Sequence, residues 1–269
     1  MAEKIFIKIA EMSITGCYVI LAVIAVRLLL KKMPKRYSYA LWAVCGFRLI
    51  FGSAFSSIFS IFSFSVRPCK IPPNIGLMKT PEVSVGIESI DKAVNVSLPP
   101  ANEFASVNPM QIIIFLCTNI RLIGLFAILL YSAVSYIMLR ARLRDAVKKT
   151  DNIYESGKIP SPFVFGIYKP RIYIPFGMSD DEYDCVIEHE KCHLRRHDNV
   201  IKVAAYMILA VHWFNPLCYI AFHLMNKDME MSCDETVLKK RNGTEYSSAL
   251  LAMATKNAAR IRCISAKPV

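Results

Sequence analysis

The segment His189-Glu190-Lys191-Cys192-His193 combines residue types and a spacing that can do metal chemistry. On a helix, residues four positions apart lie on one face, so both imidazoles can bind one zinc ion with Glu190 beside it. A zinc ion at such a site lowers the pKa of water to about 7, and the intervening glutamate takes the proton as general base. The pattern predicts a one-zinc peptidase site, although a surface helix can carry these residues by chance.

A catalytic zinc ion normally has three protein ligands and one open position. A third histidine in the metzincin pattern is excluded, because Arg196 and Asn199 occupy the required positions. His197 lies one more turn along the helix, roughly 6 Å further on, so we expect a surface or supporting role. Glu230 is the better third ligand, and Asp234, one turn later, can accept the free N–H of a ligating histidine. The alternative for this pair is a solvated acidic helix face.

The composition indicates that this site belongs to a membrane protein. Of the 269 residues, 54% are hydrophobic and 20% are charged, and the mean hydropathy is +0.37. This is too apolar for an ordinary soluble domain. The apolar runs 14–30, 49–66 and 122–139 each approach the roughly 20 residues that cross a bilayer. We therefore expect two transmembrane helices in residues 1–66 and a third in residues 110–140.

The net charge of +12 is distributed as in a membrane protein rather than a nucleic-acid-binding protein. Basic clusters follow the first run, at residues 31–36, and the third run, at residues 140–149. Lysine and arginine at the ends of spans are retained in the cytoplasm. The prediction is an outside N-terminus, an irregular extracellular loop over residues 67–109, and a cytoplasmic-side domain over residues 141–269 without direct nucleic-acid contact.

Short elements in the last domain must position the motif. Residues 162–166 and 171–175 are two β-prone runs that predict a small β-hairpin. Ser179 as N-cap and Glu182 at the capping-box position predict a helix that begins before the motif and contains both histidines. A substrate peptide could add as a strand beside residues 171–174. The residues expected to bind it are Arg171, Ile172, Tyr173 and Ile174.

The apolar run 203–225 must turn back if Glu230 is to reach the same zinc ion. A straight crossing would carry Glu230 about 30 Å away from His189. Residues 213–216 include Asn215 and Pro216, and proline disfavours helix at the residue before it. The sequence thus predicts a membrane-dipping helical hairpin within a mostly α, multi-pass membrane protein, beside a gluzincin-like domain that faces the cytoplasm.

Several ordered motifs resemble the β-lactam sensor-transducer membrane metallopeptidases of the Bla and Mec resistance systems. The matching segments lie at residues 161–166, 169–175, 189–198, 212–216 and 228–235. The resemblance implies a protein of the bacterial cell membrane that inactivates a cytoplasmic transcriptional repressor and also cuts itself. Carried over by position, His189, His193 and Glu230 bind zinc, Glu190 is the base, and Asp198 and Asp234 support the ligands. Expected partners are the repressor, membrane lipid and a second copy in a homodimer.

One departure concerns the C-terminal end of the matching region. In the sensor proteins a last span and an external penicillin-binding domain follow the peptidase, whereas only residues 250–269 follow the last clear match here. We therefore expect no antibiotic sensor in this chain. Two other functions stay open on the sequence: a quality-control membrane protease with broad specificity, and a non-catalytic membrane signal transducer.

Overall fold

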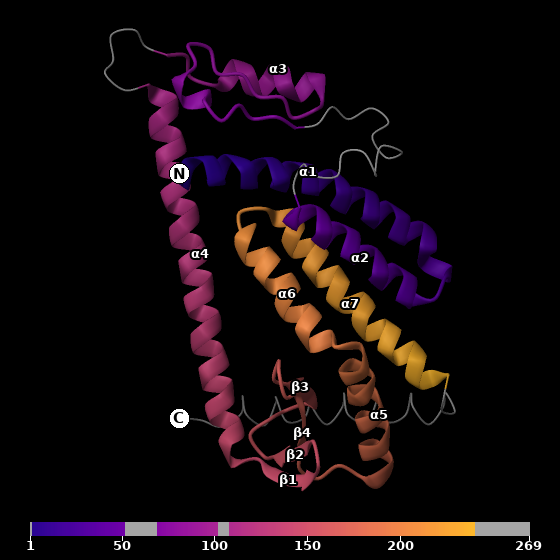
Figure 1. Cartoon of the computed structure of the whole chain (residues 1–269). Coiled ribbons are helices and arrows are strands. Elements are labelled where there is room, and N and C mark those ends of the chain that lie inside the picture. Colours follow the sequence, from indigo (N-terminus) through magenta and orange to yellow (C-terminus); the bar gives the residue numbers. More distant parts are fainter. Residues whose placement is uncertain (1, 52–68, 102–107, 240–269) are drawn as a thin grey trace, which may run out of the picture. The chain divides into compact units, whose positions relative to one another are not determined.

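The computed structural model describes residues 2–51, 69–101 and 108–239, and most of them are helical (Figure 1). The helices are α1 (Ala2–Leu29), α2 (Lys35–Ile50), α3 (Glu88–Ser97), α4 (Pro109–Arg142), α5 (Asp180–Arg196), α6 (Asp198–Val211) and α7 (Pro216–Leu238). The strands are β1 (Val147–Thr150), β2 (Ile153–Ser156), β3 (Phe163–Phe165) and β4 (Arg171–Pro175). Single 3-10 turns follow α1 and α4 and interrupt the segment before α3.

Two of the described helices are long and apolar enough to cross a membrane. They are α1 with its following turn, Ala2–Lys32, and α4 with its following turn, Pro109–Asp145. These correspond to the first and third predicted spans. The second predicted span, residues 49–66, lies almost entirely outside the described residues. The described chain therefore supports a protein with two candidate spans and a small sheet.

The described chain forms two compact units, each made of three separate segments. Unit 1 comprises the described residues of Met1–Lys32, Ala40–Leu130 and Tyr206–Leu224, and unit 2 comprises those of Met33–Tyr39, Tyr131–Ala205 and Met225–Val269. The segment Tyr206–Leu224 thus packs with the first helices, and Met33–Tyr39 groups with the later segments of unit 2. No local sequence pattern indicates this grouping, because the contacts join segments that are far apart in the chain.

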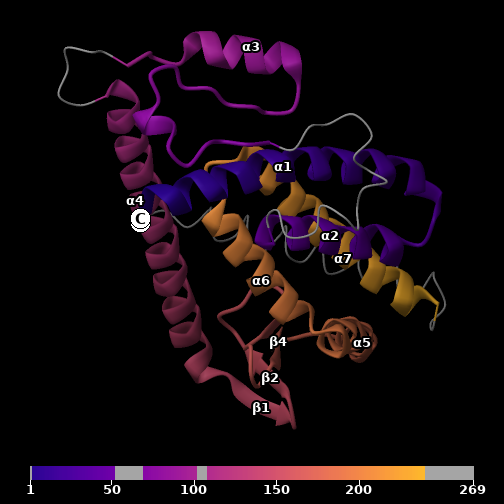
Figure 2. The ribbon, with the colours of Figure 1, turned by 45° about the horizontal axis from the view of Figure 1, so that its top comes forward.

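Within unit 1, α1 and α2 lie side by side (Figure 2). A Cβ atom on Gly16 would lie 2.4 Å from Leu49 Cδ2, so glycine allows this close approach. The turn between α6 and α7 is fixed to two other helices. Trp213 Nε1 donates to the Arg121 carbonyl in α4 at 3.2 Å, and Asn215 Nδ2 donates to Ser13 Oγ in α1 at 2.8 Å.

The segment 69–101 is more ordered than the irregular loop that its composition predicts. The backbones of Lys70 and Ser84 form an antiparallel bridge, and α3 follows. Glu11 Oε1 in α1 accepts from the Ile71 N–H at 2.7 Å, and Asp91 accepts from the Val85 N–H. Side-chain acceptors therefore satisfy backbone donors that a proline-rich segment cannot pair in a sheet.

Unit 2 contains a four-stranded sheet in the order β1-β2-β4-β3. β2 and β4 are parallel, and the other neighbouring pairs are antiparallel. Strands β1 and β2 were not predicted, because residues 140–149 were considered as a basic cluster after a span. The helix ends at Arg142 and the chain turns into β1.

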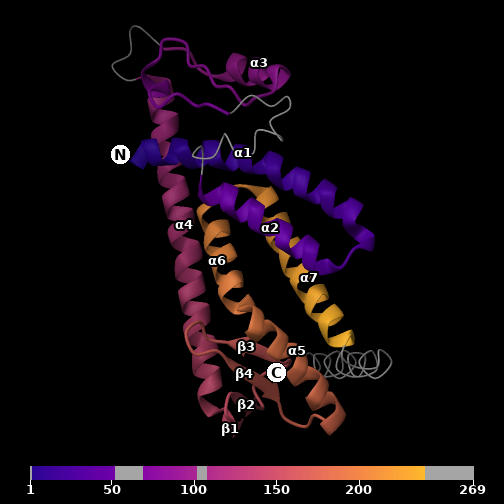
Figure 3. The ribbon, with the colours of Figure 1, turned by 45° about the vertical axis from the view of Figure 1, so that its right-hand side comes forward.

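Alternate side chains of β4 pack on opposite faces of this sheet, as expected for a strand. Ile172 and Ile174 pack against Val186 and Ile187 of α5, which lies beside the sheet (Figure 3). Tyr173 packs on the other face in a cluster with Leu143. The sheet thereby holds α5, the helix that carries the predicted metal-binding motif, through a buried aliphatic contact.

Candidate metal centre

Helix α5 begins with the predicted capping box. Ser179 Oγ accepts from the Glu182 N–H at 3.4 Å, and the Glu182 carboxylate accepts from the Ser179 N–H at 3.1 Å. These bonds satisfy two backbone donors that a helix start leaves free. The prediction of a helix start at Ser179 is confirmed. The helix then continues without interruption through both histidines of the motif.

Three donor atoms converge in unit 2. His189 and His193 lie one turn apart on α5, with their Nε2 atoms 3.1 Å apart. Glu230 on α7 places its Oε2 atom 3.2 Å from His193 Nε2 and 3.5 Å from His189 Nε2. The structure therefore brings together the three residues that the sequence analysis selected as ligands, although 37 residues separate Glu230 from His193.

A carboxylate lies behind each histidine. Asp234 Oδ1 is 3.2 Å from His189 Nδ1, and Asp198 Oδ2 is 2.8 Å from His193 Nδ1. Asp198 reaches back to α5 because His197, between α5 and α6, has a left-handed backbone with φ 55°. That conformation ends α5 and starts α6 at the next residue. Both aspartates lie where the sequence analysis expects supporting residues, and His197 provides the bend.

Lys202 and Glu190 complete the surroundings of the three donor atoms. Lys202 Nζ on α6 is 2.9 Å from Glu230 Oε1, which leaves Oε2 of the same carboxylate for the histidines. Glu190 is 8% exposed. Burial raises the pKa of its carboxyl and outweighs the opposing effect of the charged forms of His189 and His193. A carboxyl with a raised pKa is suited to accept and return a proton near neutral pH.

The neighbouring carboxylates change the pKa values of the three donor residues. Burial alone would lower the pKa of His189, but its hydrogen bonds to Asp234 and Glu230 raise it to about 10. Burial also opposes protonation of His193, but Asp198 and Glu230 raise its pKa to about 9. Burial would raise the pKa of Glu230, yet hydrogen bonds from both histidines lower it.

The predicted substrate-binding residues are not positioned as expected. Arg171, Ile172, Tyr173 and Ile174 belong to β4, which pairs with β2 on one side and β3 on the other. Both hydrogen-bonding edges of this strand are therefore occupied, and no substrate strand can add beside it. This prediction was wrong because β2 was not recognised in the sequence. Within the described sheet, the edge strands are β1 and β3.

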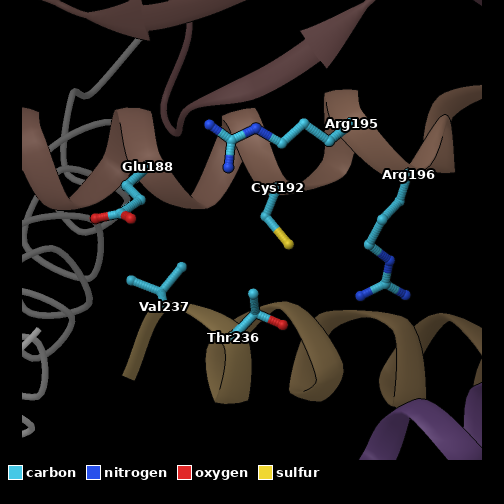
Figure 4. Close-up of a pocket in the computed structure, with 6 residues that line it drawn as sticks. All are labelled: Glu188, Cys192, Arg195, Arg196, Thr236 and Val237. Atoms are coloured by element: carbon cyan, nitrogen blue, oxygen red, sulfur yellow. The ribbon is translucent and has the colours of Figure 1, made fainter. Parts of the chain in front are cut away.

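A separate cavity of about 140 Å³ lies between α5 and α7 within unit 2. Figure 4 shows its lining, with the Cys192 sulfur directed from α5 toward α7. The other lining residues are Glu188, Arg195, Arg196, Thr236 and Val237. None of the three converging donor residues lines it. The cavity is therefore distinct from the position a metal ion would occupy.

Three further residues around the centre were not selected from the sequence. Lys202 lies four residues after Asp198, so the shared face of α6 is a signal that could have identified it. Arg196 Nε lies 3.6 Å from Asp198 Oδ1. Tyr39 donates its hydroxyl to the same Oδ1 atom at 3.0 Å from 159 residues away, and no local spacing could have indicated this contact.

The fold and the site define a mostly helical protein with candidate membrane spans and a histidine- and carboxylate-rich centre of the kind found in metallopeptidases. Residues 7–269 match the family described as BlaR1 peptidase M56, so the chain belongs to this metallopeptidase family. The resemblance to the Bla and Mec regulatory proteins stated from the motifs is confirmed.

Individual relatives match over a shorter region. The methicillin resistance protein mecR1 of Staphylococcus aureus is 36% identical over 103 residues, which are 37% of this chain and 18% of the relative. The mecR1 protein of Staphylococcus epidermidis matches to the same extent. The regulatory protein BlaR1 of Bacillus licheniformis is 36% identical over 99 residues, which are 35% of this chain and 16% of the relative. The aligned region covers less than a fifth of each relative.

Proposed function

We propose that this chain is a membrane-embedded zinc endopeptidase that regulates gene expression by hydrolysing peptide bonds of a cytoplasmic partner, such as a transcriptional repressor, or of itself. The observation that carries the proposal is the set of three donor atoms from His189, His193 and Glu230, 3.1–3.5 Å apart. Membership of the M56 family and the similarity to regulatory proteins support the same conclusion.

The donor set fits one zinc ion. Zinc in proteins is bound tetrahedrally at about 2.0–2.1 Å by nitrogen and oxygen, which places neighbouring donor atoms about 3.3–3.4 Å apart. The observed separations of 3.1, 3.2 and 3.5 Å lie around this value. Each histidine also has a carboxylate on its outer nitrogen, the arrangement that fixes the orientation of ligating imidazoles. His189, His193 and Glu230 would hold the ion, which leaves the fourth position of a catalytic site open.

The chain's own residues then have separate tasks. A bound zinc ion would supply Lewis-acid activation of water and of the scissile carbonyl. Glu190 would accept a proton from the attacking water and return it to the leaving amine, for which its buried carboxyl is suited. Asp234 and Asp198 would keep the two imidazoles oriented with Nε2 inward. Lys202 would hold the Oε1 atom of Glu230.

The helices α6 and α7 support a hairpin that dips into the inner leaflet. Their connection, residues 212–215, is short, and Tyr206 in α6 packs against Phe222 in α7 with ring centroids 6.2 Å apart. Met207, Tyr219 and Ile220 are 45–48% exposed within unit 1. Apolar side chains exposed near candidate spans suit contact with lipid. We place residues 67–109 and the N-terminus outside, and residues 141–269 on the cytoplasmic side.

The free edge of β3 is the better candidate for binding an extended substrate. β3 contacts α5, whereas β1 lies at the opposite edge of the described sheet. A peptide that adds as a strand to an exposed sheet edge binds through backbone hydrogen bonds, so many different sequences can bind in this way. A substrate bound at β3 would lie next to the helix that carries His189, Glu190 and His193.

A comparison of cleaved proteins in cells tests the proposed function. Cells that express the wild-type chain or the Glu190→Gln variant, together with a candidate repressor, are compared by mass spectrometry of protein N-termini. We expect a new N-terminus on the repressor or on this chain in the wild type only, because the amide cannot take up the proton. Purified wild type should also contain about one zinc ion per chain.

A matched control separates loss of the base from loss of a charge on α5. Asp184 is an exposed acid on the same helix, and Asp184→Asn should leave cleavage unchanged. Equal cleavage by Glu190→Gln and the wild type would overturn the peptidase assignment. Cleavage of many unrelated membrane proteins would instead identify a quality-control protease.

A further inference from the structure

Asp198 has two carboxylate oxygens with different partners. Its Oδ2 atom faces His193 Nδ1 at 2.8 Å, and its Oδ1 atom accepts from the Tyr39 hydroxyl at 3.0 Å. The side chain of Asp198 is 1% exposed, so water cannot replace either partner freely. The orientation of this carboxylate is therefore set by the groups on its Oδ1 side as well as by His193.

Tyr39 is itself held in place from two directions. The guanidinium of Arg196 lies over the Tyr39 ring at 4.7 Å from its centroid, and Arg196 Nε is 3.6 Å from Asp198 Oδ1. Burial and the neighbouring Asp198 raise the pKa of the Tyr39 phenol, so the hydroxyl keeps its proton and remains a donor. A neutral donor and a cation thus share one carboxylate oxygen.

The segment that carries Tyr39 is also attached to α7. The Lys35 backbone N–H, at the start of α2, donates to Glu235 Oε2 at 2.8 Å. Glu235 follows Asp234, which contacts His189. An acid at a helix N-terminus is favourable because it satisfies a free N–H and the helix dipole. Residues Met33–Tyr39 therefore join unit 2 through bonds to both sides of the candidate metal centre.

We propose that Tyr39 is a positioning residue for the metal centre: its hydroxyl fixes the carboxylate of Asp198, which in turn orients His193. The proposal rests on the proposed zinc site. Residues Met33–Tyr39, which follow the first candidate span, thereby contribute to the metal centre of unit 2. Loss of the hydroxyl leaves Asp198 Oδ1 with the longer Arg196 contact among the described residues. His193 and the weaker bond from the Cys233 thiol, both at Oδ2, then hold the carboxylate less firmly in its orientation.

The test measures metal binding by the full chain rather than proteolysis. Zinc affinity is determined by competition with a chromophoric chelator for the wild type and for Tyr39→Phe. We expect roughly 3- to 10-fold weaker binding by the variant, the effect of losing one buried hydrogen bond behind a ligand. With Co²⁺ as the probe, the visible absorption bands of the variant should also change, because they report ligand orientation.

A control and a double-mutant cycle separate positioning from general structure. Tyr37 lies in the same segment, is 44% exposed, and its hydroxyl accepts from Arg36, so Tyr37→Phe should bind zinc like the wild type. Because Tyr39 acts through Asp198, adding Tyr39→Phe to Asp198→Asn should cause no further loss. A variant that merely lowered the thermal stability of the protein would weaken zinc binding in the Asp198→Asn background as well, so it would not produce this non-additive result.

The outcomes distinguish the two proposals. If the full chain binds no zinc at all, the proposed function fails. If the chain binds zinc and Tyr39→Phe matches Tyr37→Phe, or if the effects of Tyr39→Phe and Asp198→Asn are additive, the zinc site stands and the role of Tyr39 is wrong.

Discussion

The two histidines of the centre depend on carboxylates that come from other helices. His189 contacts Asp234 on α7, and His193 contacts Asp198 at the start of α6. In the metal-free chain these carboxylates raise the pKa of His189 to about 10 and that of His193 to about 9. Under the proposed function, a zinc ion would displace the protons that these carboxylates favour, so proton and metal would compete for the same Nε2 atoms.

This competition predicts how zinc binding depends on pH. Because the pKa values of both histidines are raised, we expect more than one proton to be released per zinc ion at pH 7. Two histidines with ordinary pKa values of about 6.5 would release only about half a proton. Affinity should therefore fall as the pH is lowered from about 9 to 6. Calorimetric titration with zinc in buffers of different ionisation enthalpy measures the proton count.

The variant Asp234→Asn provides the comparison for this titration. It removes the hydrogen-bonded charge that raises the pKa of His189, so fewer protons should be released. Its zinc affinity should also fall, roughly 10- to 100-fold, as for other residues that orient a ligand. Release of half a proton or less by the wild type would contradict the raised pKa values.

The residues nearest to the proposed zinc position were easier to predict than those behind them. His189, Glu190 and His193 follow a local spacing, and the requirement for a third ligand indicated Glu230 and Asp234. Asp198 was indicated only by resemblance to a family. Tyr39 has no sequence signal, because its contact with Asp198 depends on tertiary structure across 159 residues.

Among the elements, the close packing of α4 against the turn after α6 depends on a glycine. A Cβ atom on Gly124 would lie 2.2 Å from Trp213 Cζ2 and 2.4 Å from Cε2, closer than atoms pack. The indole would have to move, and its hydrogen bond to the Arg121 carbonyl would be lost. Trp213 can therefore occupy this position because Gly124 in α4 has no side chain.

We expect Gly124→Ala to lower the stability of the purified protein in detergent by roughly 1–3 kcal/mol, the usual cost of overpacking. Thermal unfolding followed by far-ultraviolet circular dichroism measures the change. Gly46→Ala is the matched control, because its Cβ would meet Ile208 Cδ1 at an ordinary 3.6 Å. Alanine favours a helix over glycine, so this control should be neutral or slightly stabilising. Equal midpoints for the two variants would contradict the close contact at Gly124.

The elements were predicted unevenly for physical reasons. Helix α5 was recognised from its capping box, and β4 from its run of β-branched and aromatic residues. Strands β1 and β2 were missed because lysines and arginines after a long helix satisfy a helical pattern as well as a strand. β1 pairs with β2, and β2 pairs with β4, through contacts that depend on tertiary structure. Because β2 occupies an edge of β4, a substrate strand cannot add there as predicted.

On the scale of the whole molecule, the charge distribution predicts opposite sides of the membrane for two exposed residues. Leu77, in the segment before α3, is 73% exposed, and Tyr168, between β3 and β4, is 92% exposed. In intact cells, a membrane-impermeant maleimide should label Leu77→Cys above the background of the native cysteines. Tyr168→Cys should gain label only after the membrane is permeabilised. The reverse pattern would invert the proposed orientation.

The separation of the ligands along the chain has a consequence for synthesis. His189 and His193 leave the ribosome before Glu230, and the Pro216 end of α7 must form before the third ligand can return to them. A nascent or prematurely terminated chain that stops before residue 230 holds two imidazoles without the third donor. Under the proposed function, the protease therefore becomes competent only after residue 230 has been synthesised, and a cell is spared cleavage by copies that stop earlier.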